Sequence, residues 1–216
     1  MITKKEKNIS EIRDPNLEDL VNLVSTKEPF QVGKGAKKII MLDCGTKFNI
    51  IHEFLKQDVT LKVVPHNYNF KKEKFDGIFI SNGPGDPEIN KETIRNIKWA
   101  IRKRKPIFGI CLGNQILALA AGAKTYKLKY GHRSQNQPCY GIGTDRCYLT
   151  SQNHGFAVDS KSLPKKWKVW FENANDGTVE GIIHESRKFF SVQFHPEATP
   201  GPEDTNWLFK KFIDSI

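Results

Sequence analysis

The sequence lacks the features that would place it in a membrane or in a secretory pathway. No apolar run approaches the roughly 20 residues of a membrane-spanning helix. The first ten residues are polar and basic and contain no apolar stretch of the kind that a secretory signal has. We therefore expect a cytoplasmic protein that makes no contact with a membrane.

Sequence signals for metals and nucleotides are also missing. The four cysteines form no C-x-x-C pair, and Lys56 follows His52-Glu53 where a zinc-binding H-E-x-x-H helix needs its second histidine. Neither the phosphate-binding loop G-x-x-x-x-G-K-[ST] nor the dinucleotide motif G-x-G-x-x-G occurs. The sequence predicts no metal site and no ATP site.

Positive charge is plentiful but scattered. Lys and Arg number 34 against 24 Asp and Glu, a net charge of +10, which is compatible with nucleic-acid binding. The densest basic run, 102–105, follows a predicted helix, where the helix dipole favours cations. Without a recognition motif we expect no nucleic-acid partner; salt-sensitive DNA binding would contradict this.

The pattern of apolar residues predicts one α/β domain of 38–216 after a lead-in or linker of 1–37. Short apolar runs at 39–42, 59–64, 78–80 and 107–110 have the composition of strands buried on both faces, and amphipathic helical patterns separate them. This alternation predicts a doubly wound, mostly parallel sheet flanked by helices.

After residue 123 the alternation stops. Short strand candidates at 147–149, 156–158, 169–171, 181–183 and 189–194 are separated by Gly, Pro, Asn and Asp turns. The C-terminal half is therefore expected to add antiparallel strands, and a last short helix is expected at 207–213.

The most informative motif is Gly109-Ile110-Cys111-Leu112-Gly113. An apolar strand, a small-residue turn and a helix have the layout of a nucleophile elbow, with Cys in place of the usual Ser. Helix N–H groups at such a turn favour a thiolate and can stabilise an oxyanion. The alternative is an inert buried Cys at the end of a strand.

A thiol nucleophile needs a base, and the base needs an orienting group. His195 ends an apolar strand and Glu197 follows two residues later, so both side chains are expected to point the same way, with Pro196 stiffening the step. His154, in a turn-like segment, is the competing candidate for the base.

A third motif is the loop Ser81 to Pro87, which includes Gly83-Pro84-Gly85 and follows a predicted strand. Parallel sheets bind ligands at the carboxyl ends of their strands, where such a loop exposes N–H groups. The simpler interpretation is an ordinary strand-to-helix connection.

Together these motifs resemble the class I (triad) glutamine amidotransferases, which carry them in the same chain order. Segments 42–47, 123–127, 136–138, 150–158 and 173–177 look like the glutaminase domain of glutamine-dependent carbamoyl phosphate synthetase, most of all the eukaryotic type that starts pyrimidine synthesis. The resemblance covers roughly 14–216 and implies a flavodoxin-like core.

The resemblance also implies roles for single residues. Cys111 matches the nucleophile, His195 the base and Glu197 its orienting partner. Leu112 and Gly83 match the two N–H donors of the oxyanion hole. The positions that match the glutamine-binding residues are Gly83, Gly85, Leu112, Gln115, Asn153, Gly155 and Phe156.

The implied reaction is the hydrolysis of L-glutamine to glutamate and ammonia through a cysteine thioester. The implied partner is a carbamoyl phosphate synthetase large subunit or fused synthetase domain, which receives the ammonia and itself uses ATP and bicarbonate, in the pyrimidine or the arginine pathway. No cofactor is implied for this chain. Residues 1–37 match the tail of a separate N-terminal domain, so we expect a weak glutaminase that a synthetase partner activates.

Two departures from the family pattern stand out. Asn114 occupies a position that is usually His, and Ser134-Gln135 replaces a usual Gly. Alternative functions are a glutaminase unit of a GMP, CTP or anthranilate synthetase, which segment 151–158 disfavours, and a non-catalytic unit with the same fold, which the intact triad does not support.

Overall fold

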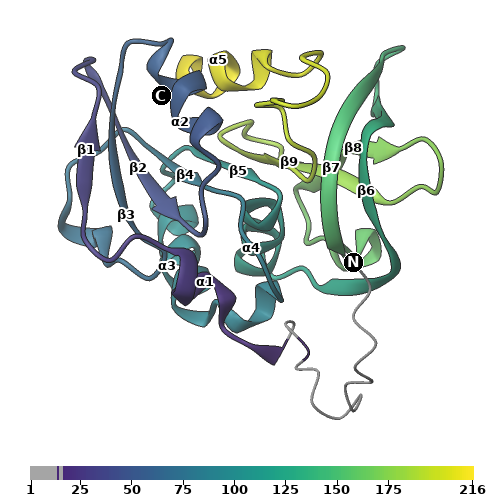
Figure 1. Cartoon of the computed structure of the whole chain (residues 1–216), viewed down its shortest axis with the longest axis horizontal. Helices are drawn as coiled ribbons and strands as arrows, with labels where there is room; N and C mark the ends of the chain where they lie inside the picture. The colour runs from purple at the N-terminus through teal and green to yellow at the C-terminus, as the bar shows by residue number, and fades with distance from the viewer. Residues whose placement is uncertain (1–13, 15–16) are drawn as a thin grey trace, which may run out of the picture.

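The computed structural model describes Asp14 and residues 17–216. Its centre is a ten-stranded sheet in the order β1-β3-β2-β4-β5-β10-β9-β7-β6-β8 (Figure 1). The parallel strands are β2 (Lys37–Asp43), β3 (Val59–Pro65), β4 (Gly77–Ile80), β5 (Ile107–Ile110) and β10 (Phe189–Val192). The predicted doubly wound, mostly parallel sheet is confirmed for this half of the molecule.

Helices cover both faces of the parallel strands because these strands are apolar on both sides. On one face, α2 (Phe48–Leu55) and α5 (Trp207–Asp214) pack on alternate strand residues such as Met41 and Phe108. On the other, α3 (Lys91–Arg102) and α4 (Leu112–Ala121) pack on the intervening residues. Short 3-10 turns lie at Phe70–Lys72, Pro87–Ile89 and Ser160–Ser162.

The C-terminal half is mostly antiparallel, as predicted, but the candidate at 189–194 is the shorter strand β10, which pairs in parallel with β5, and the other strands are longer than the sequence indicated. The two candidates 147–149 and 156–158 belong to one strand, β7 (Cys147–Val158), and its partner β6 (Thr125–Gly141) was not predicted. β8 (Trp167–Asn173) pairs with both β6 and β9 (Val179–His184), so this half curls back on itself.

The N-terminal boundary differs from the predicted one. Within the expected linker, α1 (Leu20–Val24) buries Val21 against the core, and β1 (Phe30–Val32) pairs antiparallel with β3. These segments belong to the folded unit, which therefore starts before residue 38. Residues 1–13 and 15–16 of the expected linker lie outside the described residues.

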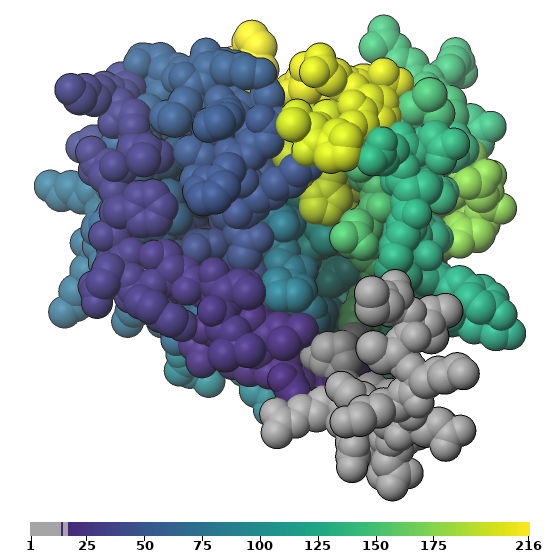
Figure 2. All heavy atoms as spheres, viewed as in Figure 1, coloured from purple at the N-terminus to yellow at the C-terminus, as the bar shows by residue number. Residues whose placement is uncertain are grey.

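The C-terminal segment bridges the two halves. In Figure 2 it lies between the helix α2 region and the antiparallel strands on the face shown. It follows β10, which pairs in parallel with β5 and antiparallel with β9. In the described part of the chain, no helix is long and apolar enough to cross a membrane.

Candidate active site

Cys111 occupies a strained turn between β5 and α4. Its backbone has φ 55° and ψ −105°, in a region that residues with a side chain rarely adopt. The flanking glycines make the turn possible: a Cβ on Gly109 would lie 2.5 Å from the Gly113 carbonyl oxygen, and one on Gly113 would lie 2.2 Å from the Ile80 carbonyl oxygen. The tight turn holds the thiol at the helix N-terminus.

The N-terminus of α4 supplies polar groups next to this thiol. The first helical hydrogen bonds run from the N–H groups of Asn114 and Gln115 to the Cys111 carbonyl oxygen, at 3.0 and 3.4 Å. The N–H groups before them, at Leu112 and Gly113, have no intrahelical acceptor. They can therefore donate to an anion that forms beside the sulfur.

The register of β10 beside β5 brings His195 to the same edge of the sheet. Val192 pairs with Ile110, and the Cys111 N–H donates to the Val192 carbonyl oxygen at 2.9 Å. Three residues later the His195 N–H donates to the Ser151 carbonyl oxygen at 2.8 Å. The imidazole is thereby fixed between the parallel strands and β7.

Glu197 holds one nitrogen of that imidazole. Its Oε1 lies 2.7 Å from His195 Nδ1, and the carboxylate is fully buried. Nε2 of His195 is left for the thiol. The geometry thus brings together the three side chains that the sequence singled out, in the order thiol, imidazole, carboxylate.

The pKa of His195 reflects these neighbours. Burial lowers it, but Cys111 and Glu197 both interact with the imidazole and outweigh burial, which raises the pKa from 6.5 to about 10. The ring is therefore an imidazolium at neutral pH. It places a positive charge beside the Cys111 sulfur.

Lys47 and Asn49, which follow β2 in the sequence, contact Glu197 and the residues after it. Lys47 Nζ lies 3.6 Å from Glu197 Oε1 and also donates to the Ala198 carbonyl oxygen. Asn49 Nδ2 donates to the Glu197 carbonyl oxygen and, at 3.1 Å, to Thr199 Oγ1. They lock the segment that follows His195.

A cavity of about 440 Å³ opens over Cys111 and His195. Of the predicted glutamine-binding residues, Gly83, Gly85, Gln115, Asn153, Gly155 and Phe156 line it. Leu112 does not: its side chain is buried in the core between α4 and the sheet, so only its backbone is in position to serve the site. Gln115 is held by a bond from Nε2 to the Phe156 carbonyl oxygen at 2.9 Å.

The contacts of His154 do not suit it to the role of base. It lines the cavity, but its Nδ1 lies 2.9 Å from the Phe156 carbonyl oxygen and its Nε2 lies 3.2 Å from Gln152 Oε1. Both ring nitrogens face other partners than the thiol. His195 is the imidazole that interacts with Cys111.

Sequence reasoning missed Arg133, which lines the same cavity and carries a positive charge into it. Its signal was weak because β6, the strand that positions it, was itself not predicted. The only hint was its place one residue before the departure at Ser134-Gln135, where the β6–β7 register shifts.

The Asn114 departure is absorbed by its surroundings. The side chain is fully buried; Nδ2 donates to Gln193 Oε1 at 3.1 Å, and Oδ1 accepts from Ser191 Oγ at 2.9 Å. Both the nitrogen and the oxygen of the amide are therefore partnered here, away from the cavity lining. Among the described residues, candidate metal ligands gather at His132, His154 and Glu180, beside the cavity rather than at Cys111.

Comparison with known proteins agrees with this geometry. The sequence model of the family "Glutamine amidotransferase class-I" matches residues 40–215. The chain is 56% identical over 204 residues to the multifunctional protein CAD of Squalus acanthias, covering 93% of this chain and 9% of that protein. It is 49% identical over 208 residues to the arginine-specific small chain of carbamoyl phosphate synthase of Aspergillus fumigatus, covering 94% and 46%. The chain thus spans from about a tenth to about half of the length of these relatives.

Solved structures share the fold at lower identity. A putative GMP synthase protein of Thermoplasma acidophilum superposes with a TM-score of 0.71 at 23% identity, over 83% of this chain and 93% of that one. A glutamine amidotransferase of Thermotoga maritima gives 0.62 at 18% identity, over 76% and 77%. At this identity the likeness establishes the fold alone.

Proposed function

The chain belongs to the class-I glutamine amidotransferase family, and we propose that it hydrolyses L-glutamine to glutamate and ammonia. The observation that carries the proposal is the strained turn of Cys111, placed at a helix N-terminus and beside the His195–Glu197 pair at the floor of a cavity. A merely structural cysteine needs none of these three features.

The proposed reaction uses the groups in a fixed order. The Cys111 thiolate attacks the carboxamide carbon of glutamine and forms a tetrahedral oxyanion, which the N–H groups of Leu112 and Gly83 stabilise. His195, protonated at neutral pH, gives its proton to the leaving ammonia. Neutral His195 then takes a proton from water, which attacks the thioester and releases glutamate. Glu197 orients the ring throughout.

The cavity suits a small polar amino acid. Gly83, Gly85 and Gly155, which offer only backbone groups, line it together with Gln115 and Asn153. Arg133 adds a guanidinium that can pair with a carboxylate. We assign these residues to holding the two ends of glutamine while the carboxamide lies at Cys111.

The ammonia is proposed to serve carbamoyl phosphate synthesis. Relatives at 49 to 56% identity bear the names carbamoyl phosphate synthase small chain and CAD, whereas the GMP synthase neighbour shares only 23% of its residues. The proposed partner is a synthetase domain or subunit that consumes ATP and bicarbonate. This chain itself is proposed to need no cofactor for glutamine hydrolysis.

The test is glutamate release from glutamine, measured with this chain alone and with a carbamoyl phosphate synthetase, ATP and bicarbonate. We expect slow release alone and faster release with the partner. Cys111→Ser should release none, whereas the control Cys147→Ser, which removes an exposed thiol, should behave as the parent. Glutamate release by Cys111→Ser at the parental rate would refute the proposed function.

A further inference from the structure

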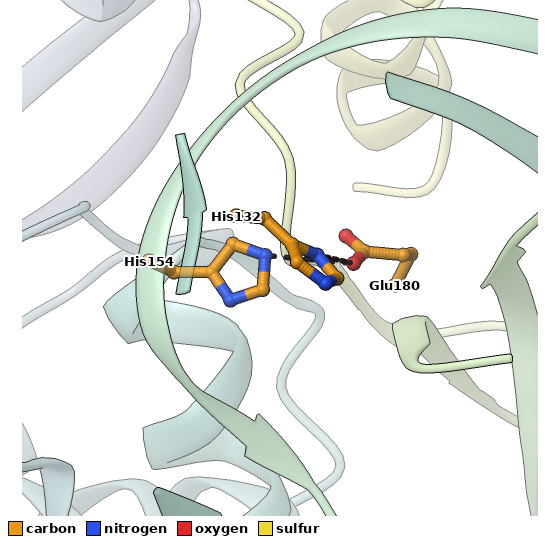
Figure 3. Close-up of side chains that lie close together, drawn as sticks. All are labelled: His132, His154 and Glu180. Atoms are coloured by element: carbon orange, nitrogen blue, oxygen red, sulfur yellow. Dashed lines mark hydrogen bonds and ion pairs between the residues drawn. The ribbon is translucent and has the colours of Figure 1, made fainter. Parts of the chain in front are cut away.

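Three side chains from three strands of the antiparallel half converge beside the cavity. His132 lies on β6, His154 on β7 and Glu180 on β9, and Figure 3 shows both imidazoles directed toward the carboxylate. His132 and His154 are cross-strand partners, with ring centroids 4.8 Å apart. The arrangement is set by strand register rather than by a mobile loop.

Glu180 is a buried carboxylate in need of a positive charge. Its side chain is 0% exposed, and its Oε2 has no hydrogen-bond partner among the described residues. Oε1 lies 3.2 Å from His132 Nδ1 and 3.4 Å from His154 Nε2. A buried carboxylate that has no cation or hydrogen-bond donor beside it destabilises the folded state. Glu180 would be in that position if both imidazoles turned unprotonated nitrogens toward it.

The outer nitrogens of both rings are occupied by acceptors. His132 Nε2 lies 3.0 Å from Asp176 Oδ2, and His154 Nδ1 lies 2.9 Å from the Phe156 carbonyl oxygen. These outer contacts orient the two rings and leave His132 Nδ1 and His154 Nε2 directed toward Glu180 Oε1. The bond to Glu180 raises the pKa of His132 to about 9, so a proton on His132 pairs with Glu180, but His154 Nε2 still faces oxygens only.

A metal cation satisfies all three groups at once. The separations of 3.2 and 3.4 Å between Oε1 and the two ring nitrogens match the edge of a tetrahedron with bonds of about 2.0–2.1 Å, but the three atoms span up to 4.8 Å, so the two imidazoles must move closer together to hold one ion. Gln152 Oε1, 2.8 Å from His132 Nδ1, stands where a fourth ligand would lie. Metal-binding histidines usually donate their other ring nitrogen to a carboxylate or to a backbone carbonyl. The outer nitrogens of His132 and His154 have these two kinds of partner.

We propose that His132, His154 and Glu180 form a binding site for one divalent transition-metal ion of the zinc type. Two imidazoles and one carboxylate suit Zn²⁺ and Co²⁺ better than Mg²⁺ or Ca²⁺. Since His154 lies between the cavity residues Asn153 and Gly155, the bound ion fixes this part of the cavity wall. The site stands apart from the proposed glutaminase chemistry and is testable whether or not that proposal holds.

The test is titration of the full chain with Co²⁺, followed by its visible absorption spectrum and by equilibrium dialysis. Cys111→Ser and Cys147→Ser are built into the background, so that neither the nucleophile nor the exposed thiol competes for the ion. We expect one Co²⁺ per chain, with the visible bands of a four-coordinate site and no thiolate charge-transfer band, and displacement by Zn²⁺.

Substitutions then locate the ion. His132→Gln should abolish stoichiometric binding, while His184→Gln, on the neighbouring part of β9, should bind as the background does. Asp176 is 46% exposed at its side chain, so Asp176→Asn can test the outer hydrogen bond without disturbing the core. It should weaken binding by about 10- to 100-fold, the usual effect of losing such a partner. The matched control is Asp145→Asn, in an exposed turn.

Three outcomes would overturn the site. They are failure to bind Co²⁺ stoichiometrically in the folded background protein, binding that His132→Gln leaves unchanged, and a thiolate charge-transfer band, which would put the ion on a cysteine. The first of these would mean that a proton on His132 neutralises Glu180. None of them bears on glutamate release, so the site and the proposed function fail or stand separately.

Discussion

Gly113 offers the sharpest test of the elbow. Replacing a helical Gly by Ala normally stabilises a helix, by about 1 kcal/mol at most. Here a Cβ would lie 2.2 Å from the carbonyl oxygen of Ile80 at the end of β4, and 2.9 Å from its carbonyl carbon. The obstacle is backbone, which cannot turn aside as a side chain can.

The magnitude follows from the shift that the clash demands. An ordinary carbon–oxygen contact needs roughly 3.3 Å, so α4 must move about 1 Å away from β4. Overpacking of this kind costs about 1–3 kcal/mol, which exceeds the propensity gain. Less the propensity gain, Gly113→Ala is expected to lose up to about 2 kcal/mol of unfolding free energy. Because Cys111 sits at the start of the displaced helix, glutamine hydrolysis should fall about 10²-fold, the usual result of a 1 Å misplacement.

Urea unfolding and steady-state glutamate release measure the two effects. The control is Gly155→Ala, whose added Cβ would meet nothing closer than Arg133 Nη2 at 3.6 Å. It should stay within about 0.5 kcal/mol of the parent in unfolding free energy. A Gly113→Ala protein that is as stable as the parent and hydrolyses glutamine at the parental rate would show that the close approach to β4 does not control the elbow.

Three further predictions concern the site. A glutamine-like electrophile at about pH 8 should label Cys111 ahead of Cys44 and Cys139, because burial raises the pKa of these two thiols and keeps them protonated. Peptide mass spectrometry identifies the labelled residue, and labelling of Cys44 or Cys139 before Cys111 would count against Cys111 as the nucleophile. Glu197→Gln should reduce glutamate release less than His195→Ala, since an amide still orients the ring; the reverse order in kcat would contradict the assigned roles. The raised pKa of His195 stabilises the folded state fully below about pH 6.5, and this contribution is lost as pH rises through about 10. The difference in unfolding free energy between the parent and His195→Gln, measured by urea titration, should therefore shrink between about pH 6 and 10. A difference that grows over this range would refute the shift.

Local sequence was a good guide where the structure depends on short segments. The four apolar runs 39–42, 59–64, 78–80 and 107–110 are strands buried on both faces, so their composition alone marks them. The glycines two residues before and after Cys111 are required by contacts within the elbow itself. Such features can be predicted because neighbours in the sequence supply the constraint.

Features that depend on distant partners were hidden. β6 is mostly exposed or half-buried and rich in Lys, Tyr and Gln, so no apolar alternation marks it; pairing with β7 makes it a strand. β1 is only three residues long and exists through its register with β3. The metal-ligand cluster was missed for the same reason, since 22 and 26 residues separate its members and no spacing motif links them.

The distance between thiol and imidazole is controlled by the register of one strand pair. Cys111 directly follows β5, and His195 lies three residues beyond the end of β10, so the pairing of Val192 with Ile110 sets how far each chain runs past the edge of the sheet. A slip of one residue would turn Phe190 and Val192 away from the core that they fill and would place Ser191 in it. The hydrophobic effect that buries these two side chains therefore also fixes the active-site geometry, because the register that packs the core is the one that brings His195 to Cys111.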